Sequence, residues 1–105
     1  MLDLVQASVF APFVGKTFNL QLEDGSMLPV LLDTLSEKAQ YRNPYAPEST
    51  RTPFAVYLTA QQATAFLEGL CHIELGEVRL EGVHVSRVAA LGRDPNNAYY
   101  QIIFN

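Results

Sequence analysis

Cys71 and His72 are the first residues whose types suggest chemistry, because a thiol beside an imidazole can form a nucleophilic pair or bind zinc. The two residues are adjacent in a stretch expected to be a strand, where neighbouring side chains point to opposite faces. A zinc site needs three or four converging ligands, and the chain has no CxxC or HxxxH spacing. We therefore expect Cys71 to be a buried, inert thiol, and we predict no metal and no cofactor.

Three carboxylates, Glu74, Glu77 and Glu81, surround an expected turn. Paired carboxylates can perform acid–base chemistry when their environments separate their pKa values, but we interpret these three as a solvated hairpin end. Ser86 and His84 lie two residues apart on one strand face, without the strained turn that exposes a nucleophile. The chain has no phosphate-binding loop and no dinucleotide fingerprint. We therefore predict that the protein is not an enzyme and has no catalytic residues.

Residues 41–53, with the sequence YRNPYAPESTRTP, differ from the rest of the chain because they combine three prolines with tyrosines and arginines. Tyrosine and arginine carry much of the energy of protein interfaces. One hypothesis is that Tyr41, Arg42, Tyr45 and Arg51 contact a protein partner. The alternative is a solvated connector whose prolines prevent it from pairing as an edge strand, and the composition leaves both open.

The whole chain has 105 residues, which suits a single domain over residues 1–105. Its net charge of −4 and its scattered basic residues argue against nucleic-acid binding, which depends on clustered Lys and Arg. No apolar run approaches the roughly 18 residues that a membrane-spanning helix needs, and the amino terminus does not resemble a secretory signal. With one cysteine and no internal disulfide, we expect a cytoplasmic protein that binds neither nucleic acid nor membrane.

Alternation of apolar and polar residues predicts a β-hairpin at residues 16–35. Residues 16–22 and 27–35 both alternate, and Asp24-Gly25 between them favours a tight turn. Pro29 cannot donate to a ladder, so this position is expected to be unpaired or at an edge. Further strands are expected to begin at Phe54 and to cover residues 71–75, 77–91 and 98–105.

Two segments depart from simple alternation. In residues 77–91 the apolar phase slips at Gly82, and a β-bulge there would place Val78, Leu80, Val83 and Val85 on one face. Residues 59–70 are compatible with a helix, since Thr59 and Gln62 have capping-box spacing, and equally with a loop holding one helical turn.

The amino-terminal residues 2–15 are expected to form one or two helical turns that cover the sheet. Asp3 and Ser8 are candidate N-caps, Pro12 suits only a first turn, and Gly15 is placed to end the segment. The side chains expected to lie on the sheet are Leu4, Val9, Phe10, Phe13 and Val14.

Together these elements predict a mainly β domain of five to six antiparallel strands with a short amino-terminal helix. A small barrel is favoured because closure removes exposed edges, with a barrel-like sandwich as the alternative. The expected core consists of Phe18, Leu20, Leu22, Val30, Leu32, Phe54, Val56, Val83, Val85, Tyr100, Ile102 and Phe104.

Three stretches, FAPFVGKTFNLQLEDGS, RTPFAVYL and GRD followed by YYQIIFN, resemble a small bacterial family known only as a domain of unknown function. These landmarks span nearly the whole chain. The resemblance implies no established activity and suggests an accessory piece of a phage-tail-like assembly; it also implies a shorter Pro/Gly-rich link in place of residues 59–70. We therefore expect a non-catalytic structural or protein-interaction domain, and the alternative is a barrel that binds a small ligand.

Overall fold

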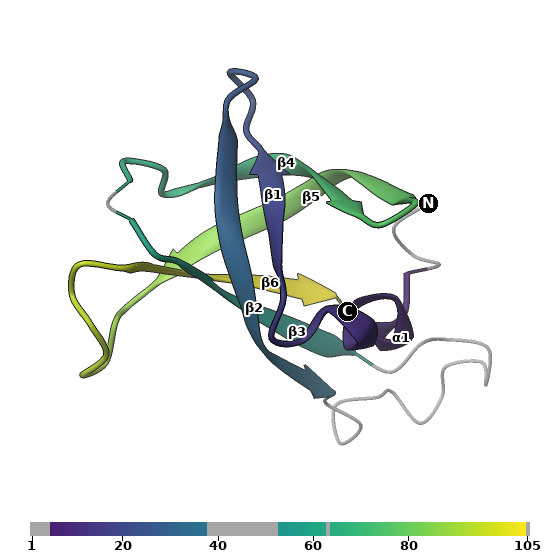
Figure 1. Ribbon diagram of the computed structural model, residues 1–105, viewed down its shortest axis with the longest axis horizontal. Coiled ribbons are helices and arrows are strands. Elements are labelled where there is room, and N and C mark those ends of the chain that lie inside the picture. Colours follow the sequence, from purple (N-terminus) through teal and green to yellow (C-terminus); the bar gives the residue numbers. More distant parts are fainter. Residues whose placement is uncertain (1–4, 38–52, 63, 105) are drawn as a thin grey trace.

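The computed structural model describes residues 5–37, 53–62 and 64–104, which form a six-stranded barrel with a short helical segment beside it (Figure 1). The candidate contacts Tyr41, Arg42, Tyr45 and Arg51 lie outside the described residues. In chain order the elements are α1 (Ala7–Phe10), the 3-10 turn η2 (Ala11–Phe13), β1 (Thr17–Gln21), β2 (Met27–Glu37), β3 (Phe54–Ala60), β4 (Glu68–Leu75), β5 (Val78–Val88) and β6 (Ala98–Phe104).

The strands close in the order β1-β2-β3-β6-β5-β4, and every neighbouring pair is antiparallel. This closure confirms the barrel and excludes the alternative sandwich for the described strands. The wall is uneven. Strands β3 and β6 pair over seven residues, whereas β1 and β4 pair over two.

The predicted hairpin between β1 and β2 is confirmed. Gly25 has a φ of 88°, which suits glycine. The Asp24 carboxylate accepts hydrogen bonds from the Ser26 hydroxyl at 2.5 Å and from the Ser26 amide at 2.9 Å, and these bonds lower the pKa of Asp24. Pro29 precedes the ladder with β3, which begins at Leu31, so its missing N–H removes no bond on that side.

The predicted bulge at Gly82 is also confirmed. Val83 pairs with Cys71 and Leu80 pairs with Ile73, so Glu81 and Gly82 together oppose His72, and Gly82 has a φ of 66°. The bulge places Leu80 and Val83 inside the barrel. The prediction for Val78 is wrong, because this residue lies at the hairpin end and its side chain is 45% exposed.

Residues 59–70 contain no helix in the part that the structure describes. Thr59 and Ala60 end β3, and β4 begins at Glu68, three residues earlier than expected. Between them, Tyr100 donates its hydroxyl hydrogen to the Phe66 carbonyl at 2.7 Å, and the two rings lie 5.4 Å apart. These tertiary contacts hold the segment against the barrel and override its helix propensity.

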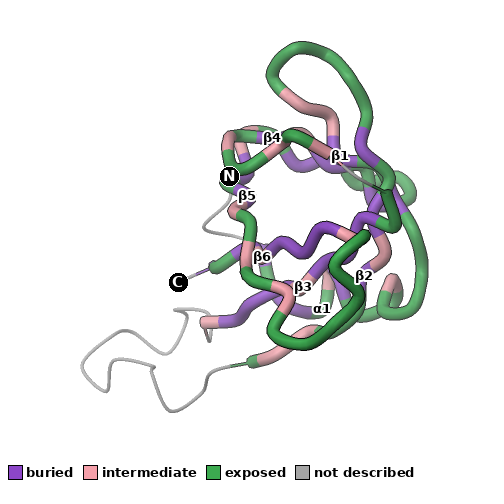
Figure 2. Tube along the Cα trace, turned by 90° about the vertical axis from the view of Figure 1, so that its left-hand side faces the viewer, coloured by how far each residue is buried: buried purple, intermediate pink, exposed green. Residues whose placement is uncertain are grey.

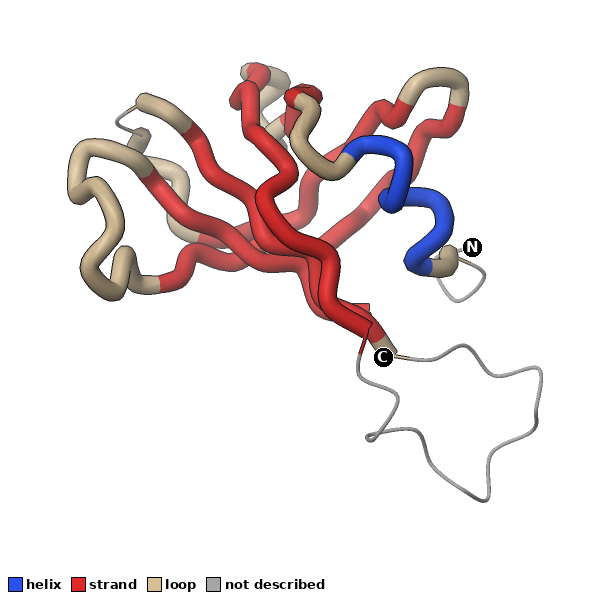
Figure 3. The backbone as a smooth tube through the Cα atoms, turned by 60° about the horizontal axis from the view of Figure 1, so that its bottom comes forward, coloured by secondary structure: helices blue, strands red, loops and turns tan. Residues whose placement is uncertain are grey.

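The amino-terminal segment forms the predicted short turns. Ser8 lies inside α1 and the N-cap is Gln6, so the capping role proposed for Ser8 is wrong; Asp3 lies outside the described residues. Pro12 occupies the first turn of η2, and Gly15 has a φ of 81°. Figure 3 shows this segment against one side of the strands.

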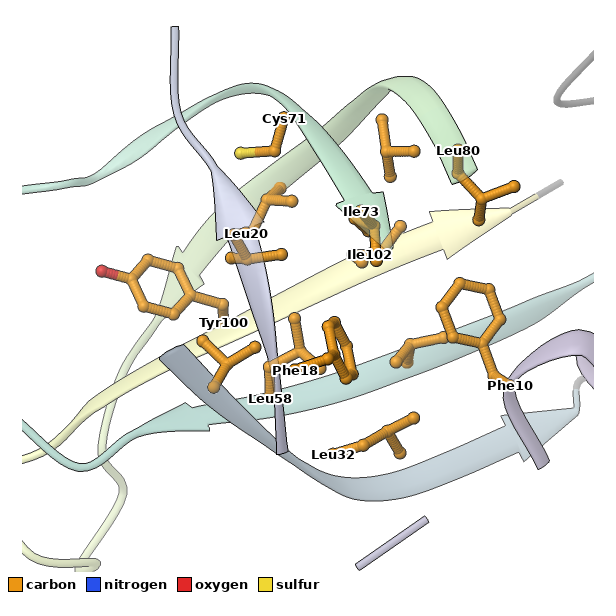
Figure 4. Packing of buried hydrophobic residues seen from close by; sticks show 14 of the residues in the cluster. Phe10, Phe18, Leu20, Leu32, Leu58, Cys71, Ile73, Leu80, Tyr100 and Ile102 are labelled. Carbon is orange, nitrogen blue, oxygen red and sulfur yellow. The ribbon is translucent and has the colours of Figure 1, made fainter. Parts of the chain in front are cut away.

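The barrel is filled by apolar side chains, which Figure 4 shows pointing inward from several strands and from α1. Figure 2 shows the same alternation of buried and exposed residues along the strands. Phe10 is fully buried and its ring lies 5.6 Å from that of Phe104. The core prediction is confirmed except at Leu22, which is only half-buried because it lies at the hairpin mouth; Val14 is exposed rather than packed on the sheet.

Candidate functional site

The shortest seam in the barrel wall lies between β1 and β4, whose pairing is limited to Leu20 with Ile73 and Gln21 with His72. Beyond this ladder, Phe13 of η2 approaches the end of β4, and its Cζ atom lies 3.6 Å from the point that a Cβ atom on Gly76 would occupy. The outer surface along this seam is therefore uneven, and it is bordered by β1 on one side and by β4 on the other.

Three hollows follow this seam. Their volumes are about 250, 410 and 440 Å³, and all three open to solvent. The first and second share Gln21 and His72, and the second and third share Leu22 and Glu23, so the three hollows adjoin one another. We call them together the seam groove, which is lined by Phe13, Thr17, Phe18, Asn19, Gln21, Leu22, Glu23, Asp24, Gly25, Ser26, Met27, Thr64, Ala65, Phe66, Glu68, Gly69, Leu70, His72, Glu74, Gly76, Arg79 and Gly82.

At one end of the seam groove, Arg79 gathers three acceptors from three strands. Its guanidinium donates to Glu74 Oε1 at 2.7 Å, to Gln21 Oε1 at 3.0 Å and to Glu81 Oε1 at 3.3 Å. All the charged side chains of this group are substantially exposed, so each ion pair contributes little to stability. These contacts hold the polar side chains beside His72 in place. The carboxylates of Glu74 and Glu81 compensate the positive charge of Arg79.

In the middle of the seam groove, Glu23 replaces a missing ladder partner. Its Oε1 accepts a hydrogen bond from the backbone amide of Leu70 at 3.2 Å. No cation among the described residues pairs with Glu23 or with its neighbour Asp24. The Glu23 side chain therefore accepts a hydrogen bond from an edge amide of β4, and its negative charge stays exposed on the surface.

His72 carries the most unusual atom of the seam groove. Its Nδ1 is buried and has no hydrogen-bond partner, although the ring lines both the first and the second hollow. A buried polar atom without a partner costs about 1–3 kcal/mol.

Replacing His72 with Phe is expected to raise the free energy of unfolding by about 1 kcal/mol, because the ring volume stays while the unpaired nitrogen is removed. Chemical denaturation measures this change. The matched control is His84→Phe, at a side chain that is 58% exposed, and it should leave stability nearly unchanged. A loss of stability in His72→Phe alone would show that Nδ1 has a partner in solution.

The residues singled out for chemistry do not form one centre. Cys71 belongs to the buried core (Figure 4), whereas His72 lines the seam groove, as predicted for neighbours on a strand. Glu74 and Glu81 meet only through Arg79, and Glu77 is exposed at the turn, which agrees with a solvated hairpin end. In the described ranges, no group of three or more His, Cys, Asp or Glu residues could hold a metal ion.

Sequence reasoning missed the seam groove. The groove depends on the register between β1 and β4, which brings Gln21 beside His72 from a distant part of the chain. Polar residues at alternate positions, such as Gln21 and His72, indicate the outer face of each strand but not the register between the two strands.

Comparison with family models shows to which family the chain belongs. The model described as Domain of unknown function (DUF6916) matches residues 5–104. The chain belongs to this family. The DUF6916 match covers every strand of the barrel and confirms the resemblance seen in the sequence. No curated protein and no solved structure matches the chain. In the part of the chain that the structure describes, no helix has the length and apolar character needed to cross a membrane.

Proposed function

We propose that this domain is a non-catalytic protein-interaction module that binds its partner along the seam groove. The observation that supports this most directly is the row of three adjoining open hollows along the shortest seam of the barrel and the turn beyond it. Apolar side chains are available there: Met27 is 53% exposed and Leu70 is 52% exposed. A surface that mixes exposed apolar groups with polar ones is typical of a protein interface.

The alternative of a small-ligand barrel has less support. Binding sites for drug-sized ligands usually have volumes of about 300–1,000 Å³ and enclose most of the ligand. The hollow with the most polar residues has only about 250 Å³, and the other two, of about 410 and 440 Å³, are open to solvent and do not enclose a ligand. The interior of the barrel is filled by side chains such as Tyr100 and Phe10. These features favour contact with an extended partner over enclosure of a small molecule.

We place the domain in the cytoplasm, as an accessory piece of a phage-tail-like assembly. The buried free thiol of Cys71 suits a reducing compartment. The role in an assembly follows from the resemblance seen in the sequence, and a barrel whose interior is filled by side chains leaves its outer surface for contacts with other proteins.

A matched pair of substitutions tests the interaction. Leu70→Arg changes an exposed residue of the seam groove, and Ile103→Arg changes a residue of β6 with similar exposure, 58%, that does not line the groove. In affinity capture from the producing organism, Leu70→Arg should lose at least about 90% of a partner that the unchanged domain retains. The variant Ile103→Arg should keep that partner. Equal retention by both variants, or no partner for the unchanged domain, would contradict the proposal.

A further inference from the structure

We propose that the seam groove receives an extended segment of the partner protein that carries Lys or Arg side chains. This inference rests on the proposed function and names the chemistry of the partner. Its basis is the shape of the groove, the charge of its lining and the acceptor oxygens that its side chains present.

The shape of the groove matches an extended chain. The hollows are lined by residues 17–26, which include β1 and the turn after it, and by residues 68–76, which include β4. At about 3.3 Å per residue, β1 spans roughly 13 Å, which about four extended residues cover, and the third hollow lies at the turn beyond its end. A compact ligand would fill only one of the three hollows.

The charge of the groove is negative. The carboxylates in its lining are Glu23, Asp24, Glu68 and Glu74, against the single guanidinium of Arg79. Arg79 is already paired with Glu74, and among the described residues Glu68 has its ion-pair contact with His84, at 3.4 Å. The guanidinium of Arg87 lies beside the third hollow, where it donates to the Thr64 carbonyl at 3.2 Å. The uncompensated carboxylates therefore lie in the middle and at the turn end of the groove. This pattern attracts ammonium or guanidinium groups and repels phosphate.

Side-chain oxygens at the Arg79 end of the groove add a specific position. Glu74 Oε1 and Gln21 Oε1 each accept one hydrogen bond from Arg79, and each oxygen has a further lone pair. A Lys or Arg side chain that enters there supplies hydrogens to these acceptors, whereas an acidic side chain would supply none.

The apolar residues of the groove explain why a peptide is favoured over a free cation. Leu22 and Leu70 line the second hollow with Glu23, and Met27 lines the first with Glu74. These side chains offer surface to the methylene groups of Lys or Arg and to the residues between the basic ones. Long basic side chains bury their aliphatic stems while the charged end stays near water. An alternating basic peptide therefore uses both kinds of surface.

Two labelled eight-residue peptides test this inference, one of alternating Lys and Thr and one of alternating Glu and Thr. Fluorescence anisotropy should show that the Lys peptide binds the full chain at least about tenfold more tightly than the Glu peptide, and that this binding weakens as salt is added. In ¹⁵N spectra, the amides of Gln21, Leu70 and His72 should shift with the Lys peptide. Equal affinities for the two peptides, or shifts confined to residues outside the groove, would overturn the inference.

Two double variants separate the groove from net charge. Glu23→Gln with Glu68→Gln removes two charges from the groove and keeps a carbonyl to accept the Leu70 amide. Glu37→Gln with Asp94→Asn removes two charges from exposed positions that do not line the groove. We expect the first variant to lose about tenfold in affinity for the Lys peptide and the second to change by less than about twofold.

Equal losses in the two double variants would show that only net charge matters and would overturn the inference. The capture experiment with Leu70→Arg reports on the proposed function separately. Loss of the partner in that variant, combined with no preference for the Lys peptide, would leave the interaction standing and reject a basic segment as its occupant.

Discussion

Replacing Phe104 with Ala is expected to lower the free energy of unfolding by about 3–5 kcal/mol, as for other large-to-small changes in a core. Phe104 is 4% exposed, and its ring stacks on Phe54 with centroids 4.6 Å apart. It also contacts Phe10 of α1, so the substitution would leave a cavity between the helix and two strands. Urea denaturation followed by circular dichroism measures the loss.

The adjacent residue supplies the control for this prediction. Ile103 lies on the opposite face of β6 and is 58% exposed, so Ile103→Ala should cost less than about 1 kcal/mol. A loss below about 1 kcal/mol for Phe104→Ala as well would show that the end of β6 is peripheral to the fold.

The thiol of Cys71 is expected to react about 100-fold more slowly in the folded protein than in the unfolded chain at pH 8. Burial raises the pKa of Cys71 from 9.0 to about 11, and the charge of Glu23 adds to the increase. Only the thiolate is nucleophilic, and a shift of about two units reduces its population about 100-fold. A disulfide reagent with optical readout, applied with and without denaturant, measures both rates.

The same pKa shift predicts how stability depends on pH. The folded thiol holds its proton to about pH 11, whereas the unfolded thiol loses it near 9.0, so unfolding releases a proton between these values. The contribution of Cys71 to stability is therefore complete below pH 9 and decreases as pH rises toward 11. A Cys71→Ala variant should lack this component of the pH dependence. Fast reaction of the folded thiol at pH 8 would contradict its burial.

Local signals in the sequence predicted much of the fold. Asp24-Gly25 and the phase slip at Gly82 each specify a backbone feature within a few residues, and both appear as expected. The helix considered for residues 59–70 fails for the opposite reason. Its propensity is local, but its structure is decided by the bond from Tyr100 to Phe66, which lie 34 residues apart in the chain.

The candidate site was harder to predict from the sequence than the fold. The seam groove exists because β1 and β4 pair over two residues only and because Glu23 reaches Leu70, a residue 47 positions away. Neither the short pairing nor the hydrogen bond can be recognised from any single stretch of the sequence. The contacts proposed from composition, Tyr41, Arg42, Tyr45 and Arg51, lie outside the described residues and stay a prediction.

Site-specific photo-crosslinking in cells tests most directly whether the partner protein binds at the seam groove. A benzophenone amino acid at Met27, which is 53% exposed in the groove, is compared with the same group at Ile103, which is 58% exposed outside it. We predict a discrete crosslinked protein at Met27 whose modified segment contains Lys or Arg, and no such product at Ile103. A discrete product at Ile103 alone, or equal products at both positions, would contradict the account.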